Sequence, residues 1–186
     1  MTKKENYLFR KIYSSVCSPR ACFDGIFYMN GYYYAANRFM AIRAFDKPDL
    51  PFVSETDRSD EAEEGIERFF DEAIQYSLGV VKLPAKSEIV ELRKMVSSYE
   101  RQNKAYLLEA ETENDPNMKI GVNINYLNMF LDVFGGRDCY CYTGGPVSPL
   151  YFVNERKNIE AILMPIRVRN MFKALNPEIL YKKEGA

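Results

Sequence analysis

The chain has 186 residues, 47% of them hydrophobic, so it is long enough to bury a core, and one domain is the simplest expectation. Lys and Arg number 25 against 26 Asp and Glu, so the net charge gives no argument for nucleic-acid binding and leaves only a local basic face to consider. No apolar run is long enough to span a membrane and the N-terminus is too charged for a signal peptide, so we expect a cytoplasmic protein without a membrane partner.

The first quarter of the chain predicts one helix followed by three strands. Leu8, Ile12 and Val16 recur at helical spacing, which predicts a helix over residues 4–16. Asn30-Gly31 is a strong hairpin signal because both positions accept a positive φ, so residues 22–36 are expected to form a hairpin. A third strand is expected over residues 39–45, and the acidic, proline-containing residues 46–60 are typical of a connection.

The middle of the chain predicts two amphipathic helices and three strands. In residues 60–78, Ile66, Phe69 and Phe70 belong to one apolar stripe with acidic residues opposite, which indicates a helix. A short strand over residues 79–84 leads into a second helix over residues 85–103. Strands are expected at about residues 104–109 and 118–122, separated by a polar turn.

The final third repeats the plan of the first. A helix is expected over residues 125–136, followed by strand-like runs at residues 138–144, 148–154 and 160–168. The sequence therefore predicts an α+β fold with a duplicated helix-plus-antiparallel-strands unit and helices on one face of the sheet. We expect residues 1–186 to form a single domain, with about residues 46–78 as a connection and an inserted acidic helix.

The four cysteines are Cys17, Cys22, Cys139 and Cys141, and the chain contains no histidine. Their spacing does not match the usual paired zinc pattern, so zinc is the weaker alternative to buried thiols, with Cys139 and Cys141 on one face of a strand. We expect no metal and no cofactor. The phosphate-binding loop and nucleophile-elbow motifs are also missing from the sequence, so catalysis is not expected.

The last third resembles the closing part of the bacterial DNA polymerase III β subunit, the sliding clamp. The features shared in order are Asn123 at the end of a strand, Tyr126-Leu127 opening a helix, a Ser148-Pro149 step and the terminal Met164-Pro165-Ile166-Arg167. The N-terminal region is similar to the opening half of a clamp domain, and residues 80–96 are similar to the start of a second half. The resemblance thus covers most of the chain except the acidic helix, and it implies a DNA-clamp-like fold.

Two departures from the family separate this chain from a full clamp. A clamp chain carries three such domains, whereas this chain has room for one, with an extra helix or half-repeat. The family's Thr-Asp-Gly-x-Arg-Leu turn is replaced by a turn in which Ala35, Ala36 and Asn37 stand at the polar positions.

In sliding clamps, basic helices hold duplex DNA without reading its bases, and Lys and Arg contacts to phosphates meet that need. The resemblance implies the following DNA-binding residues: Lys4, Arg10, Lys11, Lys86, Arg93, Lys94, Arg101 and Lys104. The alternative is a solvated helix face, because Glu88 and Glu91 are interspersed among these cations.

The resemblance also implies a partner-binding surface for short peptide motifs of replication-type proteins. Its residues are Ile162, Met164, Pro165, Ile166 and Arg167. The family supplies the opposing wall from another domain, so here the wall requires a second subunit or the inserted helix. The alternative is a final core strand with an edge proline.

Two functional hypotheses follow. The first is a non-catalytic, clamp-like protein that binds DNA independently of sequence, tethers replication-type partners, or does both, and forms a homo-oligomer because one domain cannot encircle a duplex. The second is a stand-alone protein-interaction or regulatory module that kept the clamp fold without DNA binding. A contiguous basic surface would favour the first hypothesis and a mixed-charge surface the second.

Overall fold

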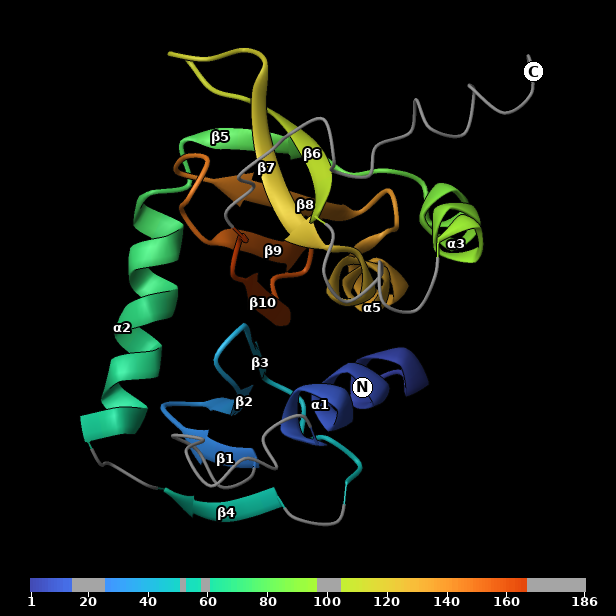
Figure 1. The fold of residues 1–186 in the computed structure, drawn as a ribbon. Helices are drawn as coiled ribbons and strands as arrows, with labels where there is room; N and C mark the ends of the chain where they lie inside the picture. The colour runs from blue at the N-terminus through green and yellow to red at the C-terminus, as the bar shows by residue number, and fades with distance from the viewer. Residues whose placement is uncertain (15–25, 51–52, 58–60, 97–104, 167–186) are drawn as a thin grey trace.

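The computed structural model describes residues 1–14, 26–50, 53–57, 61–96 and 105–166. Over these ranges the chain forms four helices and ten strands (Figure 1). The helices are α1 (Lys3–Ser14), α2 (Glu61–Gln75), α3 (Lys86–Met95) and α5 (Ile124–Phe134). The strands are β1 (Ile26–Met29), β2 (Tyr32–Ala36), β3 (Met40–Ala44), β4 (Val53–Asp57), β5 (Gly79–Lys82), β6 (Ala105–Glu111), β7 (Met118–Asn123), β8 (Cys139–Thr143), β9 (Leu150–Asn154) and β10 (Ile159–Leu163).

All ten strands belong to one sheet in the order β4-β1-β2-β3-β10-β9-β8-β5-β6-β7. Every pairing is antiparallel except that of β4 with β1, which is parallel and lies at one edge. The unit α1-β1-β2-β3 and the unit α5-β8-β9-β10 meet where β3 pairs with β10. The predicted α+β class and the duplicated helix-and-strands unit are therefore confirmed.

Helices cover both faces of the sheet, as Figure 1 shows, with α1, α3 and α5 on one side and α2 on the other. Alternate residues of β3 divide between these faces: Ile42 packs in the core beneath α1 and α5, and Ala41 packs with Phe70 of α2. The helices of the two repeated units thus share one face, as expected. The helix outside the resemblance, α2, covers part of the opposite face.

Local sequence signals explain several element boundaries. Asn30 and Gly31 adopt positive φ values of 48° and 88°, as the hairpin between β1 and β2 requires. The Asn123 side chain accepts hydrogen bonds from the backbone N–H groups of Asn125 (2.9 Å) and Tyr126 (3.4 Å), which caps the start of α5. This cap explains why an asparagine ends β7 immediately before a helix.

Three boundaries differ from those expected. The predicted connection over residues 46–60 is wrong in part, because β4 lies inside it and adds an edge strand to β1. The final strand was expected to run through residues 160–168, but β10 ends at Leu163 and Pro165 lies beyond it. Proline cannot donate to a ladder, so it falls where regular pairing stops. The helix predicted over residues 85–103 is also interrupted, because α3 ends at Met95 and Val96 is extended. Residues 97–103 of that prediction, and residues 15–16 of the helix predicted over residues 4–16, lie outside the described residues.

A buried ion pair joins the two halves of the sheet beneath α2. The Arg43 guanidinium donates two hydrogen bonds to one oxygen of the Glu160 carboxylate, from Nε at 3.0 Å and from the terminal nitrogen at 2.7 Å. The Tyr151 hydroxyl donates to the same oxygen at 2.9 Å. Burial opposes the charge of Arg43, but the charge and hydrogen bonds of Glu160 leave the pKa of Arg43 above its ordinary value.

The same guanidinium holds α2 against the sheet. Its central carbon lies 4.7 Å from the centre of the Tyr32 ring and 4.6 Å from the centre of the Phe70 ring. Because Phe70 belongs to α2, the cation–π contact connects the helix to β3 and, through Glu160, to β10. The position of α2 on the sheet therefore depends on this cluster.

We predict that Glu160→Gln lowers the free energy of unfolding by about 3 kcal/mol, because it leaves the buried Arg43 charge without a counterion. Urea unfolding measures the change. The control is Glu109→Gln, which removes the exposed cross-strand pair with Lys119 and should cost less than about 1 kcal/mol. Equal losses in the two variants would contradict the role given to the buried pair.

Candidate partner-binding pocket and basic helix face

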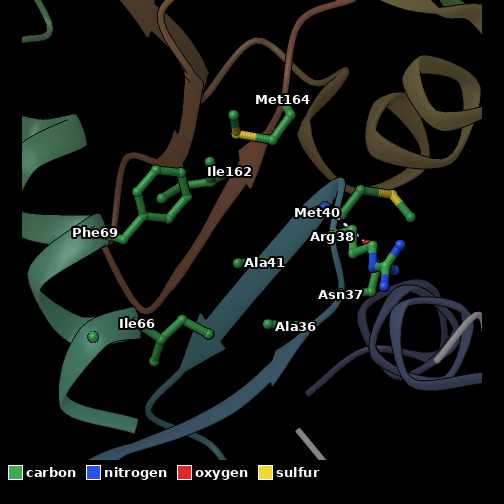
Figure 2. A pocket seen from close by; sticks show the side chains of 10 residues that line it. Ala36, Asn37, Arg38, Met40, Ala41, Ile66, Phe69, Ile162 and Met164 are labelled. Atoms are coloured by element: carbon green, nitrogen blue, oxygen red, sulfur yellow. Dashed lines mark hydrogen bonds between the residues drawn. The ribbon is translucent and has the colours of Figure 1, made fainter. Parts of the chain in front are cut away.

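A pocket of about 300 Å³ opens where three elements meet on the α2 side of the sheet (Figure 2). Figure 2 shows Ile66 and Phe69 projecting from α2 across the pocket toward the strands, with Asn37 and Arg38 on the far side. The lining residues are Ala36, Asn37, Arg38, Met40, Ala41, Gly65, Ile66, Phe69, Ile162 and Met164. They are mostly apolar and Arg38 is the one charged residue, a composition suited to an apolar side chain rather than to a charged cofactor.

The turn between β2 and β3 forms the first wall, and Asn37 fixes its shape. The Asn37 side-chain oxygen accepts hydrogen bonds from the backbone N–H groups of Phe39 (2.8 Å) and Met40 (3.0 Å). Its side-chain nitrogen donates to the carbonyl oxygen of Ile12 in α1 at 3.2 Å. An asparagine with these bonds stabilises a tight turn, so hydrogen bonds between the Asn37 side chain and the backbone fix the shape of this wall.

The end of β10 forms the second wall and contains two of the predicted partner-binding residues. Ile162 is fully buried at the base of the pocket, and Met164 is half-buried at its rim. The backbone N–H of Met164 donates to the carbonyl oxygen of Phe39 at 2.9 Å, which ties the chain end to the β2–β3 turn. The two sequence segments that the clamp resemblance singled out are thus neighbours in space.

The other predicted partner residues do not line this pocket. The Ile166 N–H donates to the carbonyl oxygen of Gly121 in β7 at 2.8 Å, and its side chain packs against Ala105 and Leu107. Pro165 is half-buried and lies between Met164 and Ile166, whose backbone N–H groups are both hydrogen-bonded. Arg167 lies outside the described residues. The expected five-residue surface therefore divides at Pro165, and its first part belongs to the pocket.

The inserted helix α2 forms the third wall and is one of the two expected sources of an opposing wall, although its individual lining residues were not predicted. Gly65 is the sequence feature that could have indicated a site on this helix, because a glycine inside a helix lowers helix stability by about 1 kcal/mol relative to alanine. A Cβ built at Gly65 would meet no atom within 4 Å, so the missing side chain leaves the pocket open. Phe69 also belongs to this wall, whereas its neighbour Phe70 is buried in the core.

The predicted basic face is partly assembled, on α1 and α3. The pKa of Lys86 is lowered, first by partial burial and then by the positive charges of Lys4 and Arg93. Lys86 therefore lies close enough to Lys4 of α1 and to Arg93 of its own helix to be repelled by each. Lys11 and Arg10 are exposed on α1, while Arg101 and Lys104 lie outside the described residues.

Several of these cations also have local partners, as the mixed-charge alternative requires. Lys86 forms an ion pair with Asp132 of α5, and Lys94 pairs with Glu91 at 2.7 Å. The Arg93 side chain donates to the Asn125 side-chain oxygen at 3.2 Å. The pair of Lys94 with Glu91 is exposed, and exposed pairs are weak, so a phosphate could compete for Lys94. DNA contact by this face stays a prediction.

The two described cysteines, Cys139 and Cys141, both belong to β8. Cys141 is buried in the core, where burial raises the pKa of its thiol, and Cys139 lies on the same face of β8 with its thiol 3.8 Å from the Val133 carbonyl oxygen. Cys17 and Cys22 are outside the described ranges. In the described ranges no group of three or more potential ligands is placed to hold a metal.

No helix of the described chain has the length and hydropathy needed to cross a membrane.

Comparison with known proteins identifies the fold. No family model and no curated protein matches the sequence. The β sliding clamp of C. crescentus, in a crystal structure with polyethylene glycol bound, is similar with a TM-score of 0.51 and 11% identity, over 90% of this chain and 65% of the clamp. The β subunit of the Streptococcus pyogenes DNA polymerase gives a TM-score of 0.49 and 12% identity, again over 90% and 65%.

The similarity to the C. crescentus clamp confirms the predicted clamp-like fold. The chain spans less than two thirds of the length of these clamps. What a complete clamp does is therefore carried to this chain only as a proposal.

Proposed function

We propose that this chain, which has the fold of a bacterial sliding clamp, is a non-catalytic protein that tethers replication-type partners. It binds a short apolar peptide segment of the partner in the pocket between α2, the β2–β3 turn and the end of β10. One observation carries the proposal. The turn that replaces the family's Thr-Asp-Gly-x-Arg-Leu motif lines this pocket together with Ile162 and Met164, two of the residues that the resemblance assigns to partner binding.

The pocket is complete within one chain. The family resemblance assigns the opposing wall to another domain, and here α2 supplies it through Ile66 and Phe69. Met164 offers an unbranched, polarizable side chain that adapts to different apolar partners.

Sequence-independent DNA binding by α1 and α3 is the second role in this proposal. The repulsion of Lys86 by Lys4 and by Arg93 supports it, because a phosphate bound there would offset the like charges. The pairs of Lys86 and Lys94 with acids favour the alternative of a protein-interaction module without DNA binding. A single domain over residues 1–186, cytoplasmic location and self-association are further parts of the proposal.

The partner role predicts that filling the pocket blocks peptide binding. Gly65→Leu places a side chain in the open space and should weaken binding of a fluorescein-labelled octapeptide with a Leu-Phe pair by at least about tenfold, as measured by fluorescence anisotropy. Gln75→Leu adds the same side chain at an exposed position of the same helix that does not line the pocket, and it should leave binding unchanged. Absence of binding by the unmodified protein, or an equal effect of both variants, would refute the proposal.

The DNA role predicts that charge reversal on α1 weakens duplex binding. Lys4→Glu combined with Lys11→Glu should reduce affinity about tenfold at low salt and lower the slope of log affinity against log salt by about 2. Arg68→Glu combined with Lys82→Glu makes the same charge change at exposed positions of α2 and β5 and serves as the control. If the unmodified protein binds no duplex, or if the control pair weakens binding equally, the interaction-module alternative replaces this role.

A further inference from the structure

A second hollow adjoins the partner pocket on the same side of α2. It has a volume of about 140 Å³ and lies between the second half of α2 and the chain before β9. Phe69 lines both the pocket and the hollow, so its ring stands between them. The residues Glu72 and Tyr76 belong to the α2 side of the hollow, and Ser148 and Pro149 to the other.

The two sites together have the length of a short extended peptide. On α2 their lining residues run from Gly65 to Tyr76, about 16 Å along the helix axis at about 1.5 Å per residue. An extended chain advances about 3.3 Å per residue, so about five residues span this distance. A segment seated in the first pocket would therefore pass over Phe69 and reach the hollow.

The charges at the two sites are opposite. Among the described lining residues, the charged one in the pocket is Arg38 and the charged one in the hollow is Glu72. The Glu72 side chain is half exposed, and its contact with Arg68, at 3.9 Å, is at the outer limit of an ion pair. Both charged groups can therefore receive a partner of opposite sign.

Apolar surface continues beyond the hollow. Tyr76, Leu78 and Val80 are 57%, 72% and 57% exposed, and they follow one another at alternate positions from the end of α2 into β5. Adjacent exposed apolar side chains of this size commonly mark a surface that contacts another protein. A partner larger than a peptide would thus find further contact area at this end.

We infer that the flank of α2 is a charge-polarised groove for an extended segment of a partner protein. The segment places an apolar side chain in the pocket, an acidic residue beside Arg38 and a basic residue beside Glu72. This inference rests on the proposed function and adds to it the partner's charge order, which fixes the direction in which the segment lies.

Four fluorescein-labelled octapeptides test the inference, all with the same central Leu-Phe pair. One has Asp before and Lys after the pair, one has the reverse order, one has Asn at both positions and one has Asp at both. Fluorescence anisotropy at low salt should show that one mixed order binds about three- to tenfold more tightly than the other, and that the difference falls as salt is raised. Equal affinity for the two orders would overturn the inference.

Charge reversal of the protein assigns the effect to the groove. Glu72→Lys should remove the preference for the favoured order and improve binding of the peptide with two Asp residues. Asp71→Lys makes the same change at the neighbouring exposed position, which lines neither site, and should retain the preference. If neither variant changes the preference for one charge order, the charged groove is refuted and the pocket proposal stands. If no peptide binds the unmodified protein, both proposals are refuted.

Discussion

The pairing of β3 with β10 is the contact on which the rest of the structure depends. It joins strands from the two ends of the chain, and its register places Arg43 opposite Glu160 and Ala41 opposite Ile162. The first pair forms the buried ion pair that holds α2 through Phe70, and the second forms the base of the pocket. A slip of β10 by one residue would turn Glu160 and Ile162 to the other face, which would break both pairs and remove the base of the pocket.

The inserted helix changes what one clamp-like domain can do. In the clamp family the opposing wall of the partner site comes from a different domain, whereas here α2 forms the opposing wall of the pocket within the same chain. The helix also separates the charges of the molecule, since the acidic α2 and the basic α1 and α3 lie on opposite faces of the sheet. In our account the two faces have separate tasks, a protein segment on the α2 face and DNA on the other, and neither requires a closed ring.

Local signals predicted much of the fold, and long-range contacts account for most of what was missed. The turn at Asn30-Gly31 and the helix start after Asn123 depend on nearby backbone geometry, so the sequence alone predicted them. The strand β4 and the end of β10 depend on which strands become neighbours, which periodicity does not reveal. The same reason explains the site, because Met164 was predicted as a partner residue while Phe69 could be recognised only after α2 was placed against β10.

Methyl NMR during peptide titration tests the central claim most directly. The probe is the unlabelled Leu-Phe octapeptide, and the protein carries isotope-labelled methionine methyl groups. Met40 and Met164 line the pocket, whereas Met118 of β7 is buried in the core beneath α1 and α5 and does not line it. We expect saturable shifts at Met40 and Met164 with little change at Met118. Binding that shifts Met118 while leaving Met164 unchanged would contradict the account.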